Sequence, residues 1–153
     1  MRERRAAREL ALQTLYAEEL TGYPLAQVAE DVAGKSDLPV ELKEFAKALF
    51  MAACLHRDEL DKFIQDKSEN WDFERIAIID RLIIRMAICE FLYFEDIPPK
   101  VSISEAIEIA KKYSTDDSSA FVNGILDAVL HQIGADIAHK LIKTEDSPVI
   151  AEG

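Results

Sequence analysis

The sequence predicts an all-α protein of about seven helices. Nearly half of its 153 residues are apolar, whereas glycine and proline contribute five residues each, which suits a compact helical protein. Apolar residues recur at helical spacing through most of the chain, and no alternating strand pattern, internal repeat or heptad run appears. A chain of this length can bury a substantial core in one domain, or in two small domains that share it.

Residues 2–20 begin the chain with a helical pattern rich in helix-forming residues. Gly22 ends this pattern, and residues 24–33 are expected to form a short amphipathic helix. Pro39 can start the next helix, which continues past a possible break near His56–Asp58. The first half of the chain is therefore predicted to be helical apart from short connections.

Residues 73–94, FERIAIIDRLIIRMAICEFLYF, are expected to form the central helix, after a polar connection anchored by Trp71. Apolar side chains cover most of its circumference, which places such a helix inside a protein or in a membrane. Charges along its whole length would each cost about 2.5–3.5 kcal/mol near a bilayer centre, so we expect a soluble central helix. The residues expected to be buried against neighbours on both sides are Ala77, Leu82, Met86 and Ile88.

Two helices are predicted after the central one. The connector EDIPPK carries two prolines and cannot continue a helix. The pattern Ser102-x-x-Glu105 resembles a capping box and predicts the start of the next helix, and Ser114-x-x-Asp117 predicts the start of the last. Within that last helix, Gly124 is expected at a close helix–helix contact.

Other local features indicate a cytoplasmic protein. Cys54 and Cys89 lie in apolar helical patterns and are expected to be small buried thiols rather than a disulfide. No apolar signal region follows the N-terminus, and Glu3 and Glu9 do not suit a mitochondrial presequence. Residues 144–153 are expected to be a disordered acidic tail.

The charge distribution restricts how the protein can bind nucleic acid. The formal net charge of −11 argues against non-specific affinity across the whole surface, so any RNA or DNA contact requires a local basic patch. Arg4, Arg5 and Arg8 lie within one helical turn near the N-terminus, where cations oppose the helix dipole. This cluster is either a solvated helix start or a site for a phosphate backbone.

The sequence contains no catalytic or metal-binding motif. There is no glycine-rich phosphate loop, no Gly-x-Ser-x-Gly elbow, and no Cys-x-x-Cys or His-Glu-x-x-His spacing. His56, His131 and His139 are scattered and are interpreted as surface or capping residues. We therefore expect no enzyme, no cofactor and no metal site.

Three segments resemble the NusB family of bacterial transcription antitermination factors. They are RRAARELALQTLY at residues 4–16, IDRLIIRMAICEF at 79–91 and IPPKVSISEAIEIAKKYSTDDSSAFVNGIL at 97–126. The resemblance implies two three-helix bundles that share a core, within one NusB-like domain at residues 1–143. The N-terminal bundle would cover about residues 1–66 and the C-terminal bundle about residues 72–143.

The resemblance also implies a function and its partners. With NusE, a ribosomal small-subunit protein, the family binds the single-stranded boxA RNA of ribosomal operon leaders. That complex joins the elongating RNA polymerase and suppresses premature termination. A basic RNA-binding partner suits the acidic charge of this chain.

The family's binding surfaces map onto two sets of residues here. Arginine, tyrosine and phenylalanine suit RNA because they offer donors to phosphate and faces for stacking. Tyr113 and Phe121, however, could equally belong to the core. The implied RNA surface consists of Arg4, Arg5, Arg8, Gln13, Lys111, Tyr113, Asp117, Ser118 and Phe121. The implied NusE surface consists of Tyr16, Leu20, Asp80 and Ile84.

The sequence leaves an alternative open. Ala6 and Ala7 occupy positions that are often basic in the family, which weakens the case for RNA binding without NusE. The protein could instead be a helical interaction module without an RNA role, also as a homodimer, with its arginines paired to acidic neighbours. The deciding observation is whether the arginine cluster points into solvent beside Lys111 and Lys112. Arg85 and Glu105 are expected to form a structural ion pair between helices.

Overall fold

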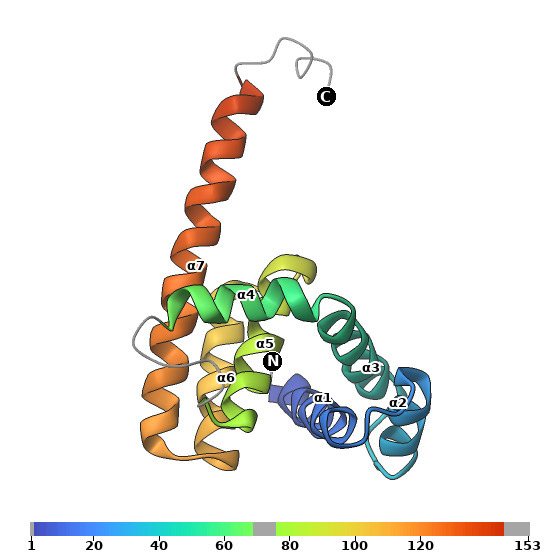
Figure 1. Cartoon of the computed structure of the whole chain (residues 1–153). Helices are drawn as coiled ribbons and strands as arrows, with labels where there is room; N and C mark the ends of the chain where they lie inside the picture. The colour runs from blue at the N-terminus through green and yellow to red at the C-terminus, as the bar shows by residue number, and fades with distance from the viewer. Residues whose placement is uncertain (1, 69–75, 146–153) are drawn as a thin grey trace.

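The computed structural model describes the backbone of residues 2–68 and 76–145, and the side chains of residues 4–68 and 76–134. In these ranges the chain forms helices and no strand, so the all-α prediction is confirmed (Figure 1). The helices are α1 (Arg2–Thr21), α2 (Leu25–Gly34), α3 (Val40–Leu55), α4 (Arg57–Lys67), α5 (Ile78–Tyr93), α6 (Pro99–Tyr113) and α7 (Asp116–Glu145).

Helix α5 is the centre of the fold. It contacts α1, α3 and α4, which precede it in the sequence, and α6 and α7, which follow it. Helices α1, α2 and α3 also pack on one another, as do α6 and α7. Part of the connection between α4 and α5 lies outside the described residues, so the division into two bundles stays a prediction.

The central helix is shorter than the sequence predicts. It begins at Ile78 rather than at residue 73, and residues 73–75, like Trp71, lie outside the described residues. Ala77 is exposed, which contradicts its expected burial, because it is the extended residue immediately before the first helical turn. The other three expected core residues, Leu82, Met86 and Ile88, are buried.

The first half of the chain follows the predicted pattern closely. After α1, Gly22 adopts a positive φ of 66°, a conformation that glycine reaches without a steric penalty. The predicted break near residues 56–58 is confirmed, because α3 ends at Leu55 and α4 begins at Arg57 with His56 between them. Directly after this turn, Arg57 on α4 donates to Glu18 in the C-terminal half of α1.

Neither predicted capping box caps its helix. Helix α6 starts at Pro99, before Ser102, whose buried hydroxyl instead donates to the Glu90 carboxylate at 2.7 Å. Helix α7 starts at Asp116, and the Thr115 hydroxyl oxygen accepts the Ser118 amide at 3.0 Å. At α7 the cap therefore falls one residue after the predicted Ser114, and α6 begins without a side-chain cap. Proline and threonine were better helix starts than the serines that the motif suggested.

Other local predictions have mixed outcomes. Gly124 is exposed, and a Cβ added there would meet no atom within 4 Å, so the expected close helix contact is wrong. Cys54 and Cys89 are free thiols, Cys89 buried and Cys54 half-buried. Helix α7 continues through Glu145 into the predicted tail, and the remaining tail lies outside the described residues. None of the described helices has the length and apolar content needed to cross a membrane.

Candidate nucleic-acid interface

The N-terminal half of α1 and the C-terminal end of α6 meet on one face of the protein. The Tyr113 hydroxyl on α6 donates to Glu9 on α1 at 2.8 Å, and Lys112 Nζ donates to the same carboxylate at 2.6 Å. Gln13 Nε2, one turn along α1, donates to the Tyr113 oxygen at 3.3 Å. These contacts bring Gln13 together with Tyr113, two residues that the sequence places far apart. Sequence reasoning missed Glu9, although it precedes Gln13 by one turn on the same helical face.

Tyr113 combines a packed ring with a polar hydroxyl at the surface. The residue is half-buried and packs against the core, and the Lys112 ammonium lies 5.4 Å from the centre of its ring. Burial and the hydrogen bond to Glu9 together raise the pKa of Tyr113. Phe121 on α7 is likewise half-buried against the core. Both rings are therefore attached to the interior and partly open to solvent.

Arg4 and Arg5 lie at the edge of this face and are paired with carboxylates. Arg5 donates twice to one Glu105 oxygen on α6, Oε2, at 2.9 Å from Nε and 2.6 Å from Nη2. This hydrogen bond raises the pKa of Arg5. Arg4 reaches Asp96 at 3.4 Å, and its guanidinium lies 4.6 Å from the centre of the Phe45 ring. Neither arginine extends freely into solvent.

Arg8 occupies the interior rather than the surface. Its side chain is 2% exposed and forms a bidentate ion pair with Glu90 on α5, with both N–O distances at 2.8 Å. The same carboxylate accepts the Ser102 hydroxyl from α6. Arg8 therefore joins three helices, and the sequence-based assignment of Arg8 to an RNA contact does not fit this buried position.

The expected ion pair between Arg85 and Glu105 is wrong. Arg85 on α5 instead forms a bidentate contact with Asp61 on α4, at 2.9 and 3.0 Å. A second carboxylate, Glu19 on α1, lies 3.6 Å from its Nη1. Glu105 on α6 instead pairs with Arg5 on α1.

The first turn of α7 supplies the remaining predicted RNA-contact residues. Asp117 is exposed, and Ser118 is half-buried, with its hydroxyl oxygen accepting from Ser114 at 2.9 Å and from Thr115 at 3.0 Å. Lys111, at the end of α6, is exposed and lies 3.7 Å from Glu108. The four basic residues of the predicted set, Arg4, Arg5, Arg8 and Lys111, thus each have a carboxylate partner. An anion that binds this face must compete with those carboxylates.

The residues predicted to contact NusE divide into two exposed and two buried ones. Tyr16 is 37% exposed and Leu20 is 65% exposed, both on the C-terminal half of α1. Ile84 on α5 is fully buried, and Asp80 is 6% exposed with one carboxylate oxygen lacking a hydrogen-bond partner in the protein. Asp80 lies in the first turn of α5, where a negative charge favours the helix dipole.

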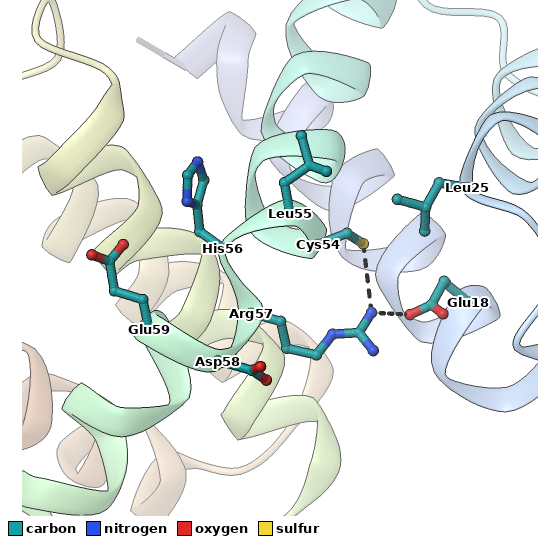
Figure 2. Close-up of a pocket in the computed structure, with 8 residues that line it drawn as sticks. All are labelled: Glu18, Leu25, Cys54, Leu55, His56, Arg57, Asp58 and Glu59. Carbon is teal, nitrogen blue, oxygen red and sulfur yellow. Dashed lines mark hydrogen bonds and ion pairs between the residues drawn. The ribbon is translucent and has the colours of Figure 1, made fainter.

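A hollow of about 550 Å³ lies where α1, α3 and α4 meet (Figure 2). Arg57 spans part of it, donating to Glu18 and to the Cys54 sulfur, the latter at 3.7 Å. Burial raises the pKa of Cys54, so the thiol stays neutral and poorly nucleophilic. His56 at the rim stacks on Tyr93 with ring centres 4.1 Å apart. Within the described residues no group of three or more His, Cys, Asp or Glu side chains could hold a metal ion.

Residues 5–131 match the model of the NusB family. The chain belongs to this family. It is 43% identical over 139 residues to the transcription antitermination protein NusB of Chloroherpeton thalassium, a match that covers 90% of this chain and 66% of that protein. The chain therefore spans about two thirds of the length of this NusB relative.

Solved NusB structures share this fold. The NusB of T. maritima, at 35% identity, matches with a TM-score of 0.75 over 82% of this chain and 89% of that chain. A crystal structure of the antitermination factors NusB and NusE in complex with dsRNA matches with a TM-score of 0.76. That match has 26% identity and covers 84% of this chain and 96% of the solved one. The fold of this chain is thus the NusB fold.

Proposed function

We propose that this protein is a transcription antitermination factor that binds single-stranded boxA RNA of ribosomal operon leaders together with NusE. In this proposal it acts in the cytoplasm by binding, without catalysis or a cofactor, joins the elongating RNA polymerase and suppresses premature termination. The observation that carries the proposal is the convergence of α1 and α6 at Glu9, Gln13 and Tyr113. Because α7 begins directly beyond Tyr113, residues implied by the family resemblance gather from three helices.

The residues divide into direct and supporting roles. Arg4, Arg5 and Lys111 supply positive charge to phosphates, and Tyr113 offers a ring edge and hydroxyl to bases. Arg8 supports the surface from below by fixing α1 against α5 and α6. Further direct contacts are proposed for residues on α1 and the first turns of α7, namely Gln13, Asp117, Ser118 and Phe121.

The ion pairs explain why NusE is required in this proposal. Each phosphate that approaches Arg5 or Lys111 must displace or share a carboxylate, and the chain carries a formal net charge of −11. Long-range repulsion therefore opposes a polyanion, and a basic partner offsets it. Tyr16 and Leu20 offer NusE an exposed apolar surface on α1. Asp80 and Ile84 support that surface from α5.

RNA binding is tested by a salt series with the NusE complex and a boxA oligonucleotide. The variants Arg5→Ala and Lys111→Ala should each weaken binding and flatten the salt slope by about 0.7, the value for one phosphate of a single strand. Lys62→Ala is the matched control, because Lys62 is an exposed lysine on α4, a helix that contributes no residue to the proposed RNA surface. Equal affinities and slopes for all three variants and the parent would reject the RNA surface.

The partner surface is tested by calorimetry with purified NusE. Leu20→Ala should weaken the complex measurably, because it removes an apolar side chain from the proposed interface. Leu20 is 65% exposed, so the change should affect the stability of the isolated protein little. Val40→Ala, at a 70% exposed apolar residue on α3, is the control. Unchanged affinity for Leu20→Ala would remove the C-terminal half of α1 from the interface.

One observation favours the alternative function, a protein-interaction module without an RNA role. Arg4, Arg5 and Arg8 are each paired with an acidic neighbour rather than pointing into solvent. Under this alternative the arginines are structural, and exposed apolar side chains bind a partner protein or a second copy. The salt series separates the two functions, and sedimentation of the isolated chain detects self-association.

A further inference from the structure

A second hollow, of about 330 Å³, adjoins the proposed RNA face on the other side of α1. Glu9 and Gln13 line it, and the same two residues form hydrogen bonds with Tyr113 on α6. The hollow is therefore continuous with the face formed by α1 and α6. Its other lining residues include Leu10 on α1 and Val32, Lys35, Ser36 and Leu38 from the end of α2 and the loop to α3.

The far wall of this hollow is a fixed turn. The Lys35 amide donates to the Val32 carbonyl at 3.2 Å and the Ser36 amide to the Ala33 carbonyl at 3.1 Å. The Ser36 hydroxyl oxygen accepts the Leu38 amide at 3.2 Å. A ligand in the hollow thus meets a wall that is already ordered, which lowers the entropy lost on binding.

Lys35 differs from the cations of the α1–α6 face. Arg5, Lys111 and Lys112 each have a carboxylate partner there. Lys35 is exposed, and among the residues that the structure describes it forms no ion pair. A phosphate can therefore reach Lys35 without displacing a carboxylate.

We propose that this hollow receives one nucleotide of the bound RNA, with its phosphate on Lys35 and its base between α1 and the α2–α3 turn. The base, rather than the phosphate, faces Glu9, because two anions in contact would repel. Apolar groups of Leu10, Val32 and Leu38 suit the faces of a base, and Gln13 and Ser36 suit its polar edge. The proposal rests on the proposed function and extends its site from α1 and α6 to α2.

The first test measures binding of a single-stranded boxA oligonucleotide by the NusE complex across a salt series. Lys35→Ala should weaken binding about fivefold at ~0.1 M salt and flatten the slope by about 0.7, the contribution of one phosphate. Lys62→Ala, an exposed lysine on α4, should change neither quantity. An unchanged melting temperature for Lys35→Ala separates a lost phosphate contact from a weakened end of α2.

The second test locates the base by replacing each nucleotide in turn with an abasic one. One abasic position should weaken the parent complex, and the same position should weaken the Lys35→Ala complex by a smaller factor. Additive effects at every position would overturn the placement of a base in the hollow. If Arg5→Ala weakens binding while Lys35→Ala does not, this inference fails and the proposed function stands. If the parent complex binds no RNA, both fail.

Discussion

Two arginines buried in the same core, Arg8 and Arg85, show how differently a charge can be held inside one protein. Both side chains are 2% exposed. The partner of Arg8, Glu90, is also 2% exposed, whereas Asp61 and Glu19, which face Arg85, are 18% and 26% exposed. Arg8 thus depends on one sealed carboxylate, and Arg85 on two that reach water.

Burial of the arginine alone therefore does not determine how much stability is lost when its partner carboxylate is removed. Removing a sealed partner leaves a charge with neither water nor another carboxylate, which is costly. Removing one of two wetter partners leaves a second carboxylate and solvent to compensate. We therefore expect stability effects to fall as the partner becomes more accessible.

The largest effect is expected for Glu90→Gln, which keeps the side-chain shape but removes the charge opposite Arg8. The free energy of unfolding should fall by about 3–5 kcal/mol, as measured by urea denaturation. A double change of Arg8→Met and Glu90→Leu should recover most of this loss, because it removes both buried charges. A loss below about 1 kcal/mol for Glu90→Gln would break the comparison, because it would mean that Arg8 finds other compensation.

A smaller effect is expected for Asp61→Asn, beside Arg85. The loss of a charged acceptor should cost about 1.5–3 kcal/mol, since Glu19 remains 3.6 Å from Arg85 Nη1. In the Asp61→Asn background, Glu19→Gln should lower the free energy of unfolding more than it does in the parent protein, because each carboxylate can compensate Arg85 when the other is absent. Strict additivity in urea denaturation would show that Glu19 does not act as the second partner.

Ser102→Ala should have a modest effect, because it removes only a neutral donor to Glu90. We expect a loss of about 0.5–1.5 kcal/mol in the free energy of unfolding. A double-mutant cycle with Glu90→Gln should give a coupling energy of about 0.5 kcal/mol or more, since the two groups are in contact. A coupling of zero would separate the hydroxyl from the ion pair.

Asp96→Ala, opposite the partly exposed Arg4, should have the smallest effect of the three ion pairs. Such surface pairs contribute about 0.2–1 kcal/mol and are screened by salt. Thermal unfolding at low and at high salt should therefore give a difference between variant and parent that shrinks as salt rises. A difference that salt leaves unchanged would place this pair with the buried ones.

The reactivity of the two thiols measures how accessible their surroundings are, Cys89 next to Glu90 and Cys54 beside Arg57. Burial, followed by the neighbouring Glu90, raises the pKa of Cys89 to about 12. At pH 8 its thiolate fraction is negligible, so a disulfide reagent should label Cys89 only as fast as the protein opens. Cys54, half-buried beside Arg57, should react much faster. The variant Cys54→Ser isolates the slow phase, and equal rates for the two thiols would contradict the sealed environment.

Helical spacing made the fold predictable, but it did not determine where each helix begins. The apolar pattern of α5 extends back to residue 73, yet the helix begins at Ile78, since Ala77 adopts an extended conformation. At α7, Ser114 and Thr115 are both good capping residues, and the choice depends on which hydroxyl meets the Ser118 amide. Such choices are made by packing rather than by local sequence.

The sequence suggested which residues to assign to the candidate interface, but not how their side chains are paired. Family resemblance named Arg4, Arg5 and Arg8 together, although one of them is buried and two are at the edge of the face. Arg4 and Arg8 share one face of α1, whereas Arg5 points elsewhere. Their carboxylate partners, Asp96, Glu90 and Glu105, lie in segments that only the fold brings near. For the same reason the sequence assigned Glu105 to Arg85, while α6 delivers it to Arg5.

The sealed pair of Arg8 and Glu90 also has a consequence for synthesis on the ribosome. The two residues are 82 positions apart, so at ~5–20 residues per second at least about four seconds separate their synthesis. During that interval α1 can associate loosely with α2 and α3, but burying Arg8 without its carboxylate would cost several kcal/mol. We therefore expect α1 to reach its final position only after α5 has emerged, so that until then the first half of the nascent chain is accessible to chaperones.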